Sequence, residues 1–181
     1  RFNWNTPIVA SPHGKSTFYY AGNVIFQSTN FGKSWEPISP DLSTNDKSKY
    51  APAGGPVFYE ATSAENNGTV INLSESPVKS GVIWAGTDDG NVQVTVNGGG
   101  RWTNVGANLP GLAAGSVISH VEASRTNADT AYVAADRHMF DDFSPYIFKT
   151  TDGGKTFVNI AGDLPRSAYV QVVKEDPRNP Q

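Results

Sequence analysis

The sequence of 181 residues contains no cysteine, which excludes disulfides, thiolate metal ligands and a cysteine nucleophile. No apolar run approaches the ~18 residues that a membrane-spanning helix needs. The first residues do not have the pattern of a signal peptide, and Arg1-Phe2-Asn3-Trp4 is not a typical natural start. We expect this N-terminus to be cut, processed or incomplete.

Positive charge is also scarce. Lys and Arg number 14 against 17 Asp and Glu, the net charge is −3, and no basic run occurs. A nucleic acid partner is therefore not expected. Hydrophobic residues make up 38%, which is too many for a disordered chain. Glycine and proline are abundant, at 18 and 12, and this is typical of a chain with many tight turns.

An eight-residue pattern occurs three times, at Ser28–Trp35, Thr95–Trp102 and Thr150–Phe157. It reads Ser/Thr, x, Asn/Asp, x, Gly, x, usually Ser/Thr, aromatic. The residues that define it are Ser28, Asn30, Gly32, Trp35, Thr95, Asn97, Gly99, Trp102, Thr150, Asp152, Gly154 and Phe157. We expect a structural turn, because Asp or Asn folds a turn onto its own side chain and Gly allows a positive φ.

Runs of β-branched and aromatic residues precede each pattern and predict strands A, B and C, while strand D starts at the aromatic residue. Strand A is expected at 7–10, 69–73 and 117–123, strand B at 18–22, 82–86 and 131–135, and strand C at 24–27, 92–94 and 146–149. Repeated four-stranded units are typical of propeller blades. A β-sandwich with a chance repeat is the disfavoured alternative.

The fold class predicted is all-β: a β-propeller segment of about three four-stranded blades and the first strand of a fourth. The expected boundaries are 5–43, 68–110 and 116–165 for the blades, 44–67 for an insertion, and 168–181 for the start of a fourth blade. Within the insertion, 57–65 could form a helical turn. A closed ring needs roughly 300 to 500 residues, so we expect a larger propeller of seven blades or more, completed by remaining blades or partner subunits.

The three patterns resemble the Asp box of the neuraminidase-type (BNR) repeat family, which includes sialidases, two-propeller xyloglucan hydrolases, sortilin and photosystem assembly propellers. Stretches such as Trp84–Gly90 and Trp35–Leu42 are most similar to exported bacterial proteins of sortilin-like or glycosyl-hydrolase-like type. The resemblance implies a propeller fold and a secreted, periplasmic or cell-surface location. It is weak evidence for an activity, because function lies in loops added to the fold.

No cofactor or metal is expected. The box lacks the additional oxygen ligands and the late Glu of a calcium loop. The three histidines, at positions 13, 120 and 138, do not have the spacing of a zinc site. The arginines are few, and no cluster of three suits a sialidase.

Strand direction alternates, so the A–B and C–D turns lie on one face and the B–C and D–A turns on the other. This second face, the B–C/D–A face, lies opposite the boxes and is where we expect a ligand. The B–C stretch Asp136–Pro145 is longer than a hairpin requires, and long loops often carry function. Its candidate ligand-binding residues are Arg137, His138, Asp141, Asp142 and Phe143.

Two functions remain open. The first is a noncatalytic module that binds protein, peptide or glycan, and the second is part of a glycoside hydrolase whose site extends to missing blades. A hydrolase needs two carboxylates, and Asp88 and Asp89 are weak catalytic candidates because Asp-Gly is also ordinary turn chemistry. If Asp88, Asp89, Asp136, Asp141 and Asp142 are all held in turns or ion pairs, the hydrolase hypothesis fails for this segment.

Overall fold

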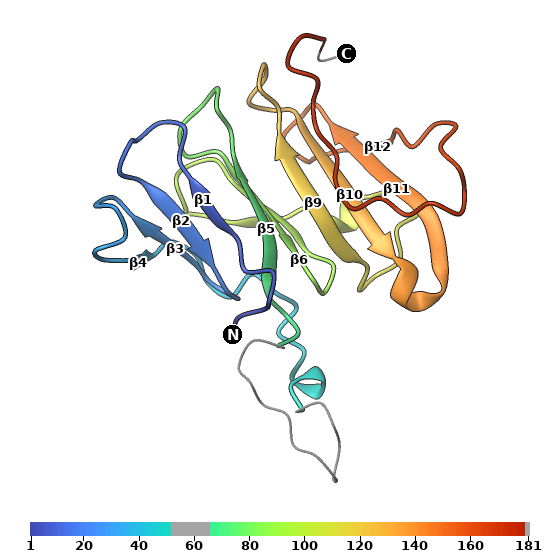
Figure 1. The fold of residues 1–181 in the computed structure, drawn as a ribbon, viewed down its shortest axis with the longest axis horizontal. Coiled ribbons are helices and arrows are strands. Elements are labelled where there is room, and N and C mark those ends of the chain that lie inside the picture. The colour runs from blue at the N-terminus through green and yellow to red at the C-terminus, as the bar shows by residue number, and fades with distance from the viewer. Residues whose placement is uncertain (52–65, 180–181) are drawn as a thin grey trace.

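The computed structural model describes residues 1–51 and 66–179. Its strands form three antiparallel four-stranded sheets, each in chain order, and the sheets stand side by side (Figure 1). The strands are β1 (Ile8–Ala10), β2 (Phe18–Ala21), β3 (Ile25–Ser28), β4 (Glu36–Pro37), β5 (Val70–Glu75), β6 (Ile83–Thr87), β7 (Val92–Thr95), β8 (Thr103–Asn104), β9 (Val117–Ala123), β10 (Ala131–Arg137), β11 (Asp142–Thr150) and β12 (Val158–Asn159). Short 3₁₀ turns are η1 (Lys47–Lys49), η2 (Gly106–Asn108) and η3 (His138–Phe140).

The predicted all-β class and the three four-stranded units are confirmed. Every residue of β6 and β7 is buried, because the second sheet has a neighbour on each of its two faces. One apolar core fills the space between the first two sheets and is centred on Ile25, Leu42 and Ile83. A second core lies between the second and third sheets and includes Trp84 and Phe148. Packing of sheet against sheet therefore provides the cores, as in a propeller.

The stretch Asp136–Pro145 differs from the predicted long loop. β10 continues to Arg137 and β11 begins at Asp142, so only η3 and Asp141 lie between them. The register shifts by an irregularity between Ala135 and Arg137, after which Arg137 pairs with Asp142. The extra residues thus lengthen the hairpin, because a bulge allows pairing to resume beyond it.

The segment 168–174 was expected to be the first strand of a fourth blade, but it forms no strand ladder in the structure. It passes across the third sheet in Figure 1 and is held through side chains. The Ser119 hydroxyl donates to the carbonyl oxygen of Val170 at 2.8 Å, and Lys174 pairs with Glu122 at 2.6 Å. A segment forms a strand ladder only when a neighbouring strand pairs with it, and no strand among the described residues pairs with 168–174.

One contact nevertheless repeats along the chain. Between the first and second sheets, the hydroxyl of Ser11, which follows β1, donates to Glu75 at the end of β5. The hydroxyl of Ser124, which follows β9, donates to Glu175 in the same way at 2.7 Å. The segment that ends at Glu175 therefore lies beside the third sheet in the same way as β5 lies beside the first sheet.

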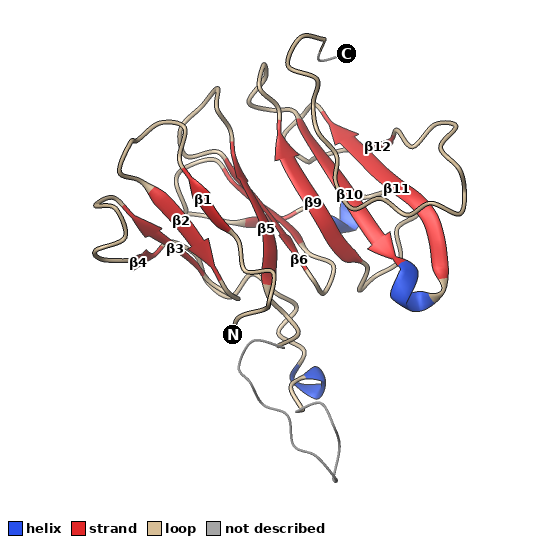
Figure 2. Cartoon of the chain, viewed as in Figure 1, coloured by secondary structure: helices blue, strands red, loops and turns tan. Residues whose placement is uncertain are grey.

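The insertion begins after Ser43, at the end of the first unit, and ends at Gly68, just before β5 of the second sheet. Its described part includes η1, where the Asp46 carboxylate accepts from the backbone N–H of Ser48 and caps the turn. The helical turn predicted at 57–65 lies outside the described residues. Both η1 and η3 lie at the lower end of the molecule in Figure 2, which is the B–C/D–A face.

Candidate functional site

The three repeated turns share one hydrogen-bond pattern. The first hydroxyl accepts from the glycine N–H, as Thr150 does from Gly154 at 2.9 Å. The Asn or Asp side chain accepts from an N–H four residues on, as Asp152 does from Thr156 at 3.0 Å. The equivalent pairs are Ser28 with Gly32, Asn30 with Ser34, Thr95 with Gly99, and Asn97 with Arg101. All three glycines have a positive φ.

The hydrogen bond from the Thr156 hydroxyl, followed by that from the Thr156 N–H, lowers the pKa of Asp152 to about 2. The aromatic residues of the turns pack inward: the Trp102 indole N–H donates to the Ile38 carbonyl at 2.9 Å, Trp35 lies against Tyr20, and Phe157 is buried. These contacts serve the fold and leave no donor set directed at a ligand.

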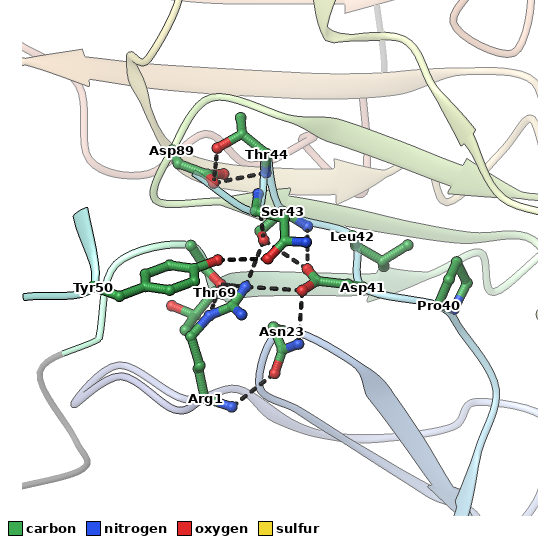
Figure 3. Close-up of polar contacts among 12 residues, drawn as sticks. Arg1, Asn23, Pro40, Asp41, Leu42, Ser43, Thr44, Tyr50, Thr69 and Asp89 are labelled. Carbon is green, nitrogen blue, oxygen red and sulfur yellow. Dashed lines mark hydrogen bonds and ion pairs between the residues drawn. The ribbon is translucent and has the colours of Figure 1, made fainter. Parts of the chain in front are cut away.

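Asp88 and Asp89 fasten the two ends of the insertion. Asp88 Oδ1 accepts from the backbone N–H groups of Gly68 and Thr69 at 3.0 and 2.7 Å. Asp89 Oδ2 accepts from the Thr44 N–H and hydroxyl at 2.8 and 2.7 Å, the bonds drawn in Figure 3. Burial, to which the neighbouring Asp89 adds, raises the pKa of Asp88. These weak catalytic candidates thus act as anchors for segments distant in sequence.

A polar network that the sequence did not predict lies beside them (Figure 3). The Arg1 guanidinium pairs with Asp41 at 2.9 Å and lies over the Tyr50 ring at 4.3 Å from its centroid. Burial opposes ionisation of Asp41, but hydrogen bonds from the Ser43 hydroxyl and the Asn23 amide outweigh it and lower the pKa of that carboxyl. The only feature of the sequence that could have indicated this network is the position of Asp41 between strand D of the first unit and strand A of the second, on the face where a ligand was expected.

The β10–β11 hairpin carries the predicted ligand-binding residues. The carboxylate of Asp136 is 4% exposed and accepts from His138 N–H at 2.8 Å, from His138 Nδ1 at 2.7 Å, and from the amide of Gln171. The His138 ring stacks on Tyr169 with 4.8 Å between centroids. The hairpin is thereby tied to the segment 168–174.

Arg137 and Asp142 face each other at 3.1 Å, and Arg137 also donates to the Ser116 hydroxyl. Hydrogen bonds from the Ser144 N–H and the Tyr146 hydroxyl lower the pKa of Asp142 to about 2. Both candidates are therefore engaged within the protein.

Asp141 has a left-handed backbone at φ 60° and is exposed, with no side-chain partner among the described residues. Phe143 is 43% exposed, and its ring packs against that of Tyr169 with 6.3 Å between the ring centroids. Of the five predicted residues, His138, Asp141 and Phe143 remain open to solvent.

A groove of about 320 Å³ lies next to this hairpin. Its polar lining comes from the chain before β1, from β5, β9 and the β10–β11 hairpin, and from the segment 168–174; these residues are Asn5, Asn72, Ser119, Asp136, His138 and Gln171. Ile71, Val117 and Met139 add an apolar part. The groove thus brings His138 together with residues that no sequence motif marked.

The arrangement is unsuited to glycoside hydrolysis by this chain alone. Asp88, Asp89, Asp136 and Asp142 are all held by hydrogen bonds or an ion pair, and a hydrolase needs two available carboxyl groups. Asp141 is the exception among the five. The Ser119 hydroxyl donates to a carbonyl, so it is not poised as a nucleophile toward His138.

Within 1–51 and 66–179, no group of three or more His, Asp or Glu side chains is arranged to hold a metal ion. In the same part of the chain, no helix has the length and hydropathy to cross a membrane.

No family model matches this chain. A curated relative, the oligoxyloglucan-reducing end-specific xyloglucanase of Emericella nidulans, is 23% identical over 183 residues, which cover 98% of this chain and 22% of the relative. The chain therefore spans about a fifth of the length of that relative.

Solved structures show the same architecture. An ancestral GH74 enzyme matches with a TM-score of 0.58 at 19% identity, over 85% of this chain and 18% of its own. The GH74 xyloglucanase from Xanthomonas campestris gives 0.56 at 19% identity, over 88% and 24%. YCF48 from Cyanidioschyzon merolae gives 0.53 at 17% identity, over 84% and 35%.

This chain has the fold of a β-propeller segment. Identities this low establish the fold alone, and the same architecture is present in GH74 enzymes and in YCF48.

Proposed function

We propose that this chain is a noncatalytic segment of an Asp-box β-propeller that binds a protein, peptide or glycan on its B–C/D–A face. The observation that carries the proposal is the groove beside the β10–β11 hairpin, which brings together polar side chains from several elements. The hairpin next to it has the exposed aromatic residues Phe140 and Phe143. Concave sites of this kind, with a few convergent polar groups, are the usual ligand sites of proteins. Four of the five candidate aspartates are held by hydrogen bonds or an ion pair, and this argues against glycoside hydrolysis within this segment.

The proposed protein is larger and exported. Its turns have the repeated hydrogen bonds described above, as expected for Asp boxes. In this proposal the blades are 5–43, 68–110 and 116–165, and further blades or partner subunits close the ring. The secreted, periplasmic or cell-surface location follows from the resemblance to sortilin-like bacterial proteins, and fractionation of producing cells tests it.

A glycoside hydrolase fragment is the second candidate, and one observation favours it. The curated relative that aligns with 98% of this chain is a xyloglucanase. In that case the active site would be shared with blades outside this segment, and Asp141 would be the one available carboxylate among the five aspartates considered above.

Screening of the full-length protein separates the two candidates. Glycan and peptide arrays are expected to give a ligand whose binding falls when His138 is replaced by alanine. Release of reducing ends from xyloglucan is expected to be absent. Hydrolysis that is lost in Asp141→Asn, with the fold intact, would favour the second candidate, and the absence of any ligand on either array would refute the first.

A further inference from the structure

Four of the polar side chains that line the groove, those of Asn72, Ser119, His138 and Gln171, direct a donor to a partner within the protein. The carboxylate of Asp136 can only accept, so His138 Nδ1 and the amide nitrogen of Gln171 must both donate to it. The amide nitrogen of Asn72 donates to the Ile118 carbonyl at 2.8 Å, and the Ser119 hydroxyl donates to a carbonyl as well. The protein has thereby fixed the orientation of four groups that line one groove.

Each of these groups keeps an acceptor for a ligand. With Nδ1 directed at Asp136, the His138 ring has Nε2 as its second nitrogen, which accepts a hydrogen bond in the imidazole form. Gln171 and Asn72 retain amide oxygens that accept no hydrogen bond from the described residues, and Ser119 retains hydroxyl lone pairs. The His138 side chain is 42% exposed, and its Nε2 has no hydrogen-bond partner among the described residues.

The charge around the groove also favours a ligand that donates hydrogen bonds. Among the described residues that line it, Asp136 carries a negative charge and none is Lys or Arg. Arg137 is occupied by Asp142 and Ser116, while Asp141 adds an unpaired carboxylate at the hairpin tip. Acceptors and negative charge together favour a cation that has only donors.

We propose, as a refinement that rests on the proposed function, that the groove binds the side chain of a lysine or arginine from a peptide. The ammonium or guanidinium group would donate to His138 Nε2 and to the amide oxygens of Asn72 and Gln171. Met139, which is 78% exposed, contributes with Ile71 an apolar wall for the methylene stem. A volume of about 320 Å³ accommodates one such side chain.

Fluorescence polarisation with the full-length protein tests this inference. The probes are fluorescein-labelled, amidated Gly/Ser octapeptides with one central Lys, Arg, Gln or Glu. We expect the Lys and Arg probes to bind about tenfold tighter than the Gln probe, and the Glu probe to bind weakest, as a single charge contact would require. Added salt is expected to narrow this difference.

Two variants and a control assign the effect to the groove. His138→Arg places a positive charge there and is expected to reduce Lys-probe binding to the level of the Gln probe. His138→Gln keeps one donor for Asp136 and one free acceptor, so its affinity is expected to stay within about threefold of wild type. His13→Arg makes the same charge change on the opposite face, where His13 contacts the Ser76 carbonyl, and is expected to have no effect.

Failure of the inference is distinguishable from failure of the proposed function. A merely structural role of His138 would weaken all four probes equally in His138→Arg and lower its thermal stability, which would overturn the inference. Equal binding of the Lys and Gln probes by wild type, or no binding of any probe, would also overturn it. Binding of cellotetraose that His138→Arg abolishes would replace the cation by a neutral glycan and leave the proposed function standing.

Discussion

Two adjacent glycines of the third box allow a direct test of how the sheets are held together. Gly153 and Gly154 have φ values of 72° and 88°, which an alanine adopts at a cost of about 1–2 kcal/mol. A Cβ on Gly153 would meet nothing within 4 Å. A Cβ on Gly154 would lie 3.1 Å from both γ-carbons of Val105 and 3.2 Å from the Trp84 ring, closer than ordinary contact.

The expected magnitudes follow from that difference. Gly153→Ala is expected to lower the free energy of unfolding only by the cost of a positive φ for alanine, about 1–2 kcal/mol. Gly154→Ala adds overpacking of the core between the second and third sheets, typically about 1–3 kcal/mol, for a total of about 2–5 kcal/mol. Since both substitutions add one methyl group to neighbouring positions of one turn, the difference between them isolates the contact between sheets.

Urea unfolding followed by tryptophan fluorescence measures both losses. Gly154→Ala is expected to lower the unfolding midpoint about 1.5 to 4 times as far as Gly153→Ala. It should also alter the native emission spectrum, because Trp84 is fully buried at the contact. Equal midpoint shifts and an unchanged spectrum would show that the glycine serves only the turn.

Three further outcomes are expected. Asp89→Ala removes a carboxylate that is 3% exposed and accepts three hydrogen bonds, so it should cost about 3 kcal/mol in chemical denaturation, and a loss below about 1 kcal/mol would contradict its anchoring role. Asp142 and Asp152 have a pKa of about 2 against the usual 3.8, so the stability they contribute is present above pH 3.8 and lost as pH falls towards 2; thermal melts should show this loss, and the double Asn variant should flatten the profile. Glu175→Ala removes the acceptor for Ser124, and hydrogen exchange should rise across 168–174 while β10 stays protected.

Much of the fold could be predicted because its signals are local. The box turn is specified by a hydroxyl, an Asn or Asp and a glycine within five residues, and its bonds close between residues two to four apart. The strands follow from short β-branched runs between turns. Strand positions in all three sheets were therefore correct to within a few residues, except where the bulge near Arg137 lengthened the third hairpin.

The candidate site was less predictable because its contacts are distant in sequence. The sequence identified the β10–β11 hairpin by its length and its polar residues. It did not indicate that Gln171 would reach Asp136, or that Asn72 and Ser119 would line the same groove. The ligand-binding roles of His138 and its neighbours remain predictions until binding is measured.

The sequence by itself determined the turns, the four-stranded units and the face opposite the boxes, since backbone preference and strand alternation act between near neighbours. Only the tertiary structure decided which carboxylates are available. Asp88 and Asp89 were weak catalytic candidates from the sequence, and their role as anchors became clear only from their contacts with Gly68, Thr69 and Thr44. A carboxylate is committed or free according to the donors that packing brings to it, and those donors come from segments that sequence spacing does not connect.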